Sequence, residues 1–324
     1  MDIKVKKSLV WAILFSIVFM VYLIWKVDWI HFVSIADRLS IKELLLAFVV
    51  FAIANFIRAL RFYKLDHTGN KLSHWWTMNQ VYNFMTSTLP GGAGEATTAY
   101  LLKRFSTFNM LSAFRILLLS RLMDLFALSM LFFVATILIS SVTPYREAAI
   151  WLSGAAFLIS SFALLRSSEQ FALKLIQRLP GKNKIVQKVC EKLTELLKIA
   201  EEQRSNNLFG IALFLSVLMT FIGIVSMHVI LRSFGVEFSL EQSFYCYGVY
   251  AIFQVIPVQG IAGIGTQAAW WTLALNAAGY NAPESIATGF VLYATYYIFV
   301  TLLALFSLLF WFKGSGKIEL FAKT

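Results

Sequence analysis

The chain has 324 residues, of which 59% are hydrophobic and 14% charged, and its formal net charge is +11. Soluble domains are about half apolar and a quarter charged, so this composition excludes a soluble enzyme, a disulfide-rich secreted scaffold and a disordered chain. Each helical crossing of a bilayer takes about 20 apolar residues. The sequence therefore predicts an all-helical, polytopic integral membrane protein that forms a single membrane domain over residues 1–324.

Six apolar runs are long enough to cross a bilayer as helices. They lie at about residues 9–25, 44–60, 118–141, 149–165, 208–231 and 286–312. The first run follows three lysines, as in a signal peptide, but it is longer than the apolar core of such a peptide and lacks a small-residue cleavage site. We therefore interpret it as the first of six transmembrane helices.

Two further apolar segments, residues 75–102 and 242–279, are interrupted in the middle by proline and glycine. The interruptions have the sequences LPGGAGE at residues 89–95 and PVQGIAGIGTQ at residues 257–267. Proline removes a helix donor, and glycine permits backbone turns that other residues resist. The roughly 14 residues on either side of each break form about 21 Å of helix, which passes the bilayer midplane without crossing. The sequence predicts two re-entrant helical hairpins.

Basic residues indicate how the chain is oriented in the membrane. If the N-terminus is cytoplasmic and each hairpin returns to the face it came from, 23 of the 28 lysines and arginines lie on the cytoplasmic side. This asymmetry agrees with the positive-inside rule, so we expect both termini in the cytoplasm. We interpret residues 166–207 as an amphipathic helical insertion on the cytoplasmic face. A partner-binding element is the alternative for this insertion.

The two halves of the chain share one order of elements in opposite orientation. Residues 1–146 and residues 147–324 each contain a span, a second span, a hairpin and a third span. Inverted repeats with interrupted helices in corresponding positions indicate a transporter whose substrate site lies where the repeats meet. We predict that the two hairpin tips meet near the midplane. A chance match of hydropathy patterns is the alternative interpretation.

Ionisable side chains near the membrane interior are energetically costly and indicate function. Arg58 and Arg61 share a helix face, where they either reach the phosphate layer or grip a lipid phosphate inside a cavity. Arg121 and Asp124 are three residues apart and can form a structural ion pair. Glu95 begins the second arm of the first hairpin, where it can cap the helix, pair with an arginine or bind a proton or cation.

The second hairpin has a different polar character. The helix that begins near Gly265 and Thr266 has no acidic residue in its first turn, so its free N–H groups are candidates for receiving a phosphate. Gln254, Gln259 and Gln267 can supply neutral hydrogen bonds in a cavity lined by protein.

The sequence gives little support for metal binding, nucleic-acid binding, dinucleotide binding or catalysis. Two cysteines and four histidines show no metal-binding spacing, and no arginine-rich tract indicates a nucleic-acid partner. Gly263–Ala268 matches the dinucleotide fingerprint but lies in a membrane segment without a βαβ unit. Glu95 and Asp124 are the acids available for catalysis, so we lean against an enzyme and predict no catalytic residues, no cofactor and no metal.

Several short motifs follow one another in a specific order. They are Arg58-x-x-Arg61, Asn83, Leu89-Pro90-x-x-Ala93-Gly94-Glu95, Ser120-Arg121-x-x-Asp124 and Pro257-x-x-Gly260-x-x-Gly263-x-Gly265. Their order and spacing resemble the lysylphosphatidylglycerol synthase/flippase transmembrane family over residues 9–312. The resemblance implies an integral domain of the plasma membrane, the inner membrane in bacteria. It also implies re-entrant helices and the movement of lipids or lipid-linked sugars between leaflets.

This chain departs from the family pattern at two places. Many relatives carry an arginine shortly after the Gly-Glu pair, where this chain has residues 96–100 without one. Many also carry an acid after the second Gly-x-Gly, where this chain has Gln267. After residue 312 only about a dozen residues remain. We therefore expect neither a soluble aminoacyl-transferase domain nor lysine transfer.

Together these observations predict a flippase-like transporter of an anionic or phosphate-bearing lipid or a lipid-linked sugar. The partner is then a membrane phospholipid or lipid-linked sugar, and a homodimer or a partner enzyme of lipid modification stays open. The alternatives are a transferase or accessory subunit for polyprenyl-phosphate sugar or aminoacyl-lipid synthesis, and a scaffold. The predicted substrate-binding residues are Arg58, Arg61, Asn83, Gly94, Glu95, Arg121, Asp124, Gln254, Gln259, Gly263, Gly265, Thr266 and Gln267.

Overall fold

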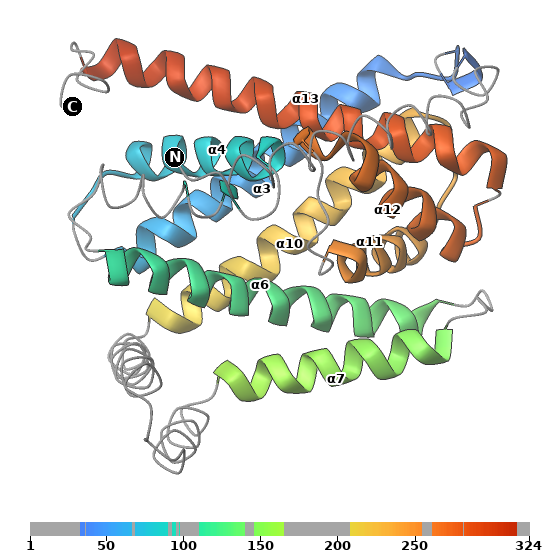
Figure 1. Cartoon of the computed structure of the whole chain (residues 1–324), viewed down its shortest axis with the longest axis horizontal. Coiled ribbons are helices and arrows are strands. Elements are labelled where there is room, and N and C mark those ends of the chain that lie inside the picture. Colours follow the sequence, from blue (N-terminus) through green and yellow to red (C-terminus); the bar gives the residue numbers. More distant parts are fainter. Residues whose placement is uncertain are drawn as a thin grey trace, which may run out of the picture.

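The computed structural model describes residues 33–35, 37–66, 69–89, 93–94, 97, 110–139, 146–164, 208–254, 261–280 and 282–315. Within these ranges the secondary structure is helical throughout, which confirms the predicted class (Figure 1). The elements are α3 (Ile41–Leu65), α4 (Leu72–Thr88), α6 (Met110–Leu138), α7 (Arg146–Leu164), α10 (Leu208–Ser233), α11 (Leu240–Gln254), η1 (Ile261–Gly263), α12 (Ile264–Ala277) and α13 (Ala282–Ser315). The predicted span at 9–25, the insertion at 166–207, Glu95 and Gln259 lie outside the described residues.

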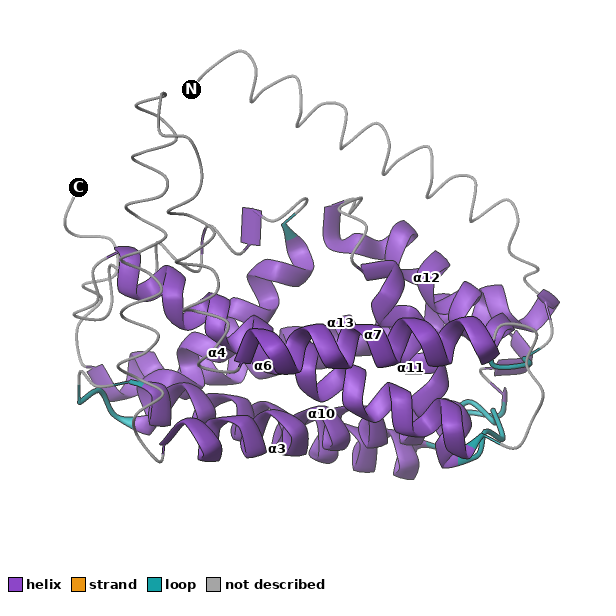
Figure 2. Ribbon diagram, turned by 90° about the horizontal axis from the view of Figure 1, so that it is seen from below, coloured by secondary structure: helices purple, strands orange, loops and turns teal. Residues whose placement is uncertain are grey.

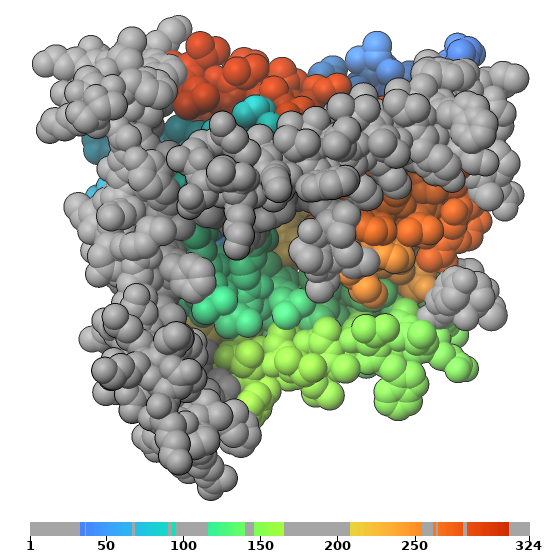
Figure 3. Space-filling model, viewed as in Figure 1, coloured from blue at the N-terminus to red at the C-terminus, as the bar shows by residue number. Residues whose placement is uncertain are grey.

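Five helices of the described part are long and apolar enough to cross a membrane. They are α3, the Ile116–Leu138 portion of α6, α7, α10 and the Glu284–Phe310 portion of α13. These helices coincide with five of the six spans that the sequence predicts. Apolar side chains also face outward, where a membrane protein meets lipid. On α7, which forms one edge of the molecule in Figure 3, Trp151 is 80% exposed.

Helices α3 and α10 pack closely along one face of the bundle (Figure 2). Small buried side chains permit the approach, since Ser226 of α10 donates a hydrogen bond of 3.0 Å to the carbonyl of Ala47 on α3. At one end of the pair, the Ser40 amide donates to the carbonyl of Ser233 at 2.9 Å. The start of α3 therefore lies beside the end of α10.

Helix α4 and the α11–α12 pair begin at opposite ends of the bundle (Figure 1). At one end, Trp75 of α4 stacks on Phe62 near the end of α3, with ring centroids 5.8 Å apart. At the other end, Phe238 before α11 contacts Tyr280 after α12, with ring centroids 5.9 Å apart. The start of α11 and the end of α12 thus lie at the same end of the bundle.

The end of α4 and the start of α12 come together on α13. Thr88 Oγ1 hydrogen-bonds Tyr297 Oη at 3.1 Å, and Tyr293 Oη donates to the carbonyl of Ala262 at 2.6 Å. Tyr293 and Tyr297 are one turn apart on α13. Helix α4 also contacts η1 directly, so the described residues nearest the two sequence breaks are neighbours in space.

The turn into α12 requires a glycine. Ala262 and Gly263 have φ values of +53° and +60°, in the left-handed region that favours glycine. A Cβ atom on Gly263 would also lie 2.7 Å from Tyr293 Oη. Gly263 therefore positions the start of α12 against α13.

Helices α6 and α11 approach most closely at Gly248. A Cβ atom built on Gly248 would lie 2.0 Å from Cδ2 of Phe132 on α6. The Phe132 ring is buried and contacts Tyr245 of α11 at 5.8 Å between centroids. The ring therefore has little room to move away, and α11 needs a residue without a side chain at position 248.

We predict that Gly248→Ala destabilises the protein by about 1–3 kcal/mol, because the added methyl group overpacks the α6–α11 contact. Thermal unfolding of the purified protein in detergent checks this. Gly210→Ala is the matched control, since a Cβ atom there meets nothing within 4 Å. Equal melting temperatures for the two variants would contradict the packing argument.

Candidate functional site

A cavity of about 740 Å³ lies inside the helix bundle. Side chains of α3, α4, α6, α10, α11, α12 and α13 line it, and its volume is in the range of small-molecule binding sites. Seven residues that the sequence predicts for the site line this cavity, namely Arg58, Asn83, Gly94, Arg121, Asp124, Gln254 and Gln267.

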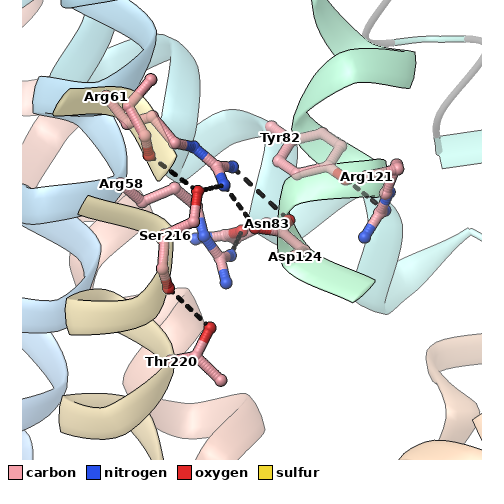
Figure 4. Close-up of polar contacts among 9 residues, drawn as sticks. Arg58, Arg61, Tyr82, Asn83, Arg121, Asp124, Ser216 and Thr220 are labelled. Atoms are coloured by element: carbon pink, nitrogen blue, oxygen red, sulfur yellow. Dashed lines mark hydrogen bonds and ion pairs between the residues drawn. The ribbon is translucent and has the colours of Figure 1, made fainter. Parts of the chain in front are cut away.

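An ion pair between Arg61 of α3 and Asp124 of α6 lies at the edge of the cavity (Figure 4). Arg61 Nη1 donates to Asp124 Oδ1 and Nη2 donates to Oδ2 at 3.4 Å, so the guanidinium engages both carboxylate oxygens. Arg61 Nη1 also donates to Ser216 Oγ of α10 at 2.7 Å. The Arg61 side chain is 1% exposed and that of Asp124 is 26% exposed. This contact joins three helices and neutralises the carboxylate.

Arg58 extends into the cavity from one turn earlier on α3 and is held by a chain of amides. Its Nη1 donates to Asn83 Oδ1 at 2.9 Å, and Asn83 Nδ2 donates to Asn55 Oδ1 at 2.5 Å. Asn55 Nδ2 in turn donates to the carbonyl of Phe51 at 2.9 Å. These partners orient the guanidinium and are themselves neutral.

Arg121 faces the same cavity from α6. Its Nη2 donates to Tyr82 Oη, and its guanidinium carbon lies 5.6 Å from the centroid of the Tyr82 ring (Figure 4). Tyr82 and Asn83 are consecutive residues of α4, so one helix turn orients both Arg121 and Arg58. Among the described residues, the lining therefore has two guanidinium groups, those of Arg58 and Arg121, and one carboxylate, that of Asp124, which Arg61 engages.

The wall formed by α11 and α12 carries amide and aromatic side chains. Tyr250 Oη donates to Gln267 Oε1 at 2.7 Å, and Gln254 Nε2 donates to the same oxygen at 3.2 Å. The Tyr250 ring stacks on Trp271 with centroids 3.7 Å apart and planes 10° apart. All four side chains line the cavity, so this wall is polar but uncharged.

Residues 9–304 match the family described as the lysylphosphatidylglycerol synthase transmembrane region. The chain belongs to this family. It matches no curated protein and no solved structure at a significant level. The resemblance drawn from the motifs is thereby confirmed. Together with the five candidate spans, the family places the protein among integral membrane proteins with a lipid-related domain.

The family motifs occupy distinct positions around the cavity. Gly94 lines it beside α4, where a Cβ atom would lie 2.5 Å from Thr86 Cα, so its bare backbone permits close packing. Gly263 and Thr266 are buried and, like Gly265, do not line the cavity. Thr266 Oγ1 donates to the carbonyl of Gly263 at 3.5 Å. The first residue of α12 that lines the cavity is instead Gln267, which directly follows Thr266.

The expected partner of Asp124 is corrected by the structure. The i, i+3 spacing suggested an ion pair with Arg121 on the same helix, whereas Asp124 binds Arg61 of α3 and Arg121 donates to Tyr82 of α4. Sequence reasoning also missed Asn55, Tyr82, Ser216, Tyr250 and Trp271. An asparagine inside an apolar run, as at residue 55, was a usable signal, because a buried amide in a membrane needs a partner.

We predict that Asp124→Asn lowers stability by about 3 kcal/mol, because it leaves the buried Arg61 without its counter-charge. The melting temperature in detergent is the measurement. Glu43→Gln is the matched control, since it breaks the exposed pair with Arg232 at 3.1 Å, and exposed pairs contribute about 0–1 kcal/mol. The double variant Arg61→Met with Asp124→Leu should recover much of the loss. An unchanged melting temperature in Asp124→Asn would refute a structural role for the ion pair.

Proposed function

We propose that this protein moves a phosphate-bearing lipid between the leaflets of the membrane, with the headgroup in the central cavity. One observation carries the proposal. Arg58 and Arg121 face the cavity from different helices, while the one carboxylate among its described lining residues, Asp124, is bound by Arg61. The described cavity is therefore positively charged, and it is surrounded by helices able to span the bilayer.

The arrangement of the two cavity arginines, Arg58 and Arg121, suits a phosphate. A guanidinium has five N–H donors in a fixed fork, and pairing with phosphate oxygens is among its strongest interactions. Asn83 and Tyr82 engage donors of Arg58 and Arg121, respectively, and are neutral. In the proposed complex the phosphate binds the guanidinium groups of both arginines, and the acyl chains stay in lipid.

An inverted repeat with two re-entrant hairpins belongs to this proposal. Under that symmetry α3 corresponds to α10, α4 to α11, and α6 to α13. The observed contacts come in matching pairs, since α4 packs on α13 and α11 packs on α6, while α3 packs on α10. This pattern supports a substrate site between two repeats that rock against each other. We place the start of α4 at the cytoplasmic face, where basic residues gather in the sequence.

Group transfer is the alternative function, and the cavity supports it less well. A transferase needs a free base or nucleophile at the reacting atom. Among the described lining residues the carboxylate of Asp124 is held in an ion pair, which suits a structural role.

Proteoliposomes with a fluorescent phosphatidylglycerol reporter and a membrane-impermeant quencher test the function. We expect the protein to bring reporter from the inner leaflet within reach of the quencher, compared with protein-free liposomes. The recovered lipid should have an unchanged mass. Binding without any change of sidedness, with or without an ion gradient, would overturn the proposal, and a product of altered mass would favour the transferase.

We predict that Arg58→Ala and Arg121→Ala each reduce the initial transport rate by about tenfold or more, because each removes a charge-assisted phosphate contact. The same sidedness assay measures the effect. Arg232→Ala is the matched control, since Arg232 is exposed at the end of α10 and outside the cavity. The role assigned to the cavity arginines would be wrong if all three variants lost the same share of the transport rate, or if none lost any.

A further inference from the structure

The cavity wall of α11 and α12 has a hydrogen-bond pattern that points to a particular headgroup. Its lining residues there are Tyr247, Tyr250, Ala251, Gln254, Gln267, Trp270 and Trp271, and none is acidic or basic. Tyr247 contacts both Tyr250 and Trp271, with ring centroids about 6 Å apart in each pair. The wall is therefore one continuous surface of rings and amides, distinct from the arginine wall of α3 and α6.

The two glutamines keep hydrogen-bonding capacity for a ligand. Gln267 Oε1 accepts from Tyr250 Oη at 2.7 Å and from Gln254 Nε2 at 3.2 Å, so this oxygen is satisfied. Within the described part of the chain, Gln267 Nε2 and Gln254 Oε1 make no hydrogen bond. Gln267 is more than nine-tenths buried, and both side chains line the cavity. The wall thus offers adjacent N–H donors and a carbonyl acceptor.

A hydroxyl group matches this pair of unused groups, because it donates and accepts at once. The stacked rings add a flat, apolar surface for the C–H faces of a polyol or sugar. Tyr250 stacks on Trp271, and Phe253 stacks on Trp270 with centroids 5.3 Å apart and planes 5° apart. Stacking fixes the orientation of these rings before a ligand binds.

A cationic headgroup fits poorly by the same reasoning. An ammonium needs a free carboxylate, and Asp124 is engaged by Arg61 while Arg58 and Arg121 would repel a second positive charge. A bare phosphate monoester would satisfy the arginines but make no contact with the amides and rings of the α11–α12 wall.

We propose that the transported lipid carries an uncharged, hydroxyl-bearing headgroup, a polyol or sugar, attached through its phosphate. The phosphate binds Arg58 and Arg121, and the headgroup hydroxyls bind Gln254 and Gln267 while its C–H face packs on the tryptophan wall. This inference rests on the proposed lipid translocation and names its substrate class.

A headgroup series in proteoliposomes tests the inference with the wild-type protein. Fluorescent phosphatidylinositol and phosphatidylglycerol should cross about tenfold faster than phosphatidic acid, which lacks the hydroxylated headgroup, and than phosphatidylethanolamine, which carries an ammonium. Equal rates for all four lipids, or preference for phosphatidylethanolamine, would overturn the substrate class and leave translocation intact. Transport of none of them would overturn the proposed function itself.

The substitution Gln267→Glu changes the charge at the centre of this wall and almost preserves the shape of the side chain. The carboxylate can still accept from Tyr250 and Gln254, but it replaces the Nε2 donors with a negative charge. We expect transport of phosphatidylinositol and phosphatidylglycerol to fall about tenfold, and their advantage over phosphatidylethanolamine to disappear.

Gln242→Glu is the matched control, because Gln242 accepts from the Ser239 amide at the first turn of α11 and does not line the cavity. It should keep the wild-type headgroup order. An unchanged order in Gln267→Glu would refute the assignment of Gln267. If that variant does not fold, the wild-type headgroup series decides the substrate class alone.

Discussion

The ion pair between Arg61 and Asp124 is the constraint on which the site depends. A guanidinium buried to 1% exposure inside a bundle of apolar helices is unstable unless a carboxylate compensates it. Here both carboxylate oxygens serve that purpose, and Ser216 binds the same guanidinium, so α3, α6 and α10 are fixed at one level. Arg61 thus occupies Asp124, and Arg58 and Arg121 lie beside this pair in the cavity lining.

Helix α4 links this charged region to the contact between the sequence breaks. Its consecutive residues Tyr82 and Asn83 orient the two cavity arginines, and Thr88 at its end hydrogen-bonds Tyr297 of α13. The neighbouring turn of α13 holds Ala262 through Tyr293. A displacement of α4 against α13 would therefore move Arg58, Arg121 and the start of α12 together, as the proposed rocking of the two repeats requires.

The sequence predicted the five described spans because membrane insertion depends on local apolarity, which a short window of residues records. It also predicted Arg58, Asn83, Arg121 and Asp124 as site residues, and the structure brings these four to one cavity. The pairing was not predictable, because Arg61 and Asp124 are 63 residues apart and meet only through the relative rotation of two packed helices. Local spacing favoured Arg121 instead. Gly263 was predicted as a substrate-binding residue from its motif alone, and the structure shows that its positive φ turns the chain against Tyr293.

The two walls of the cavity differ chemically although the proposed repeat makes their scaffolds alike. Arginines come from α3 and α6 of the first half, and amides and stacked rings come from α11 and α12 of the second. An inverted pair of identical walls would bind a headgroup equally in two orientations. Unequal walls select one orientation, with the phosphate toward the arginines from whichever leaflet the lipid enters. In the proposed transport cycle, the headgroup keeps these contacts while the surrounding helices change access and the acyl chains reorient around it.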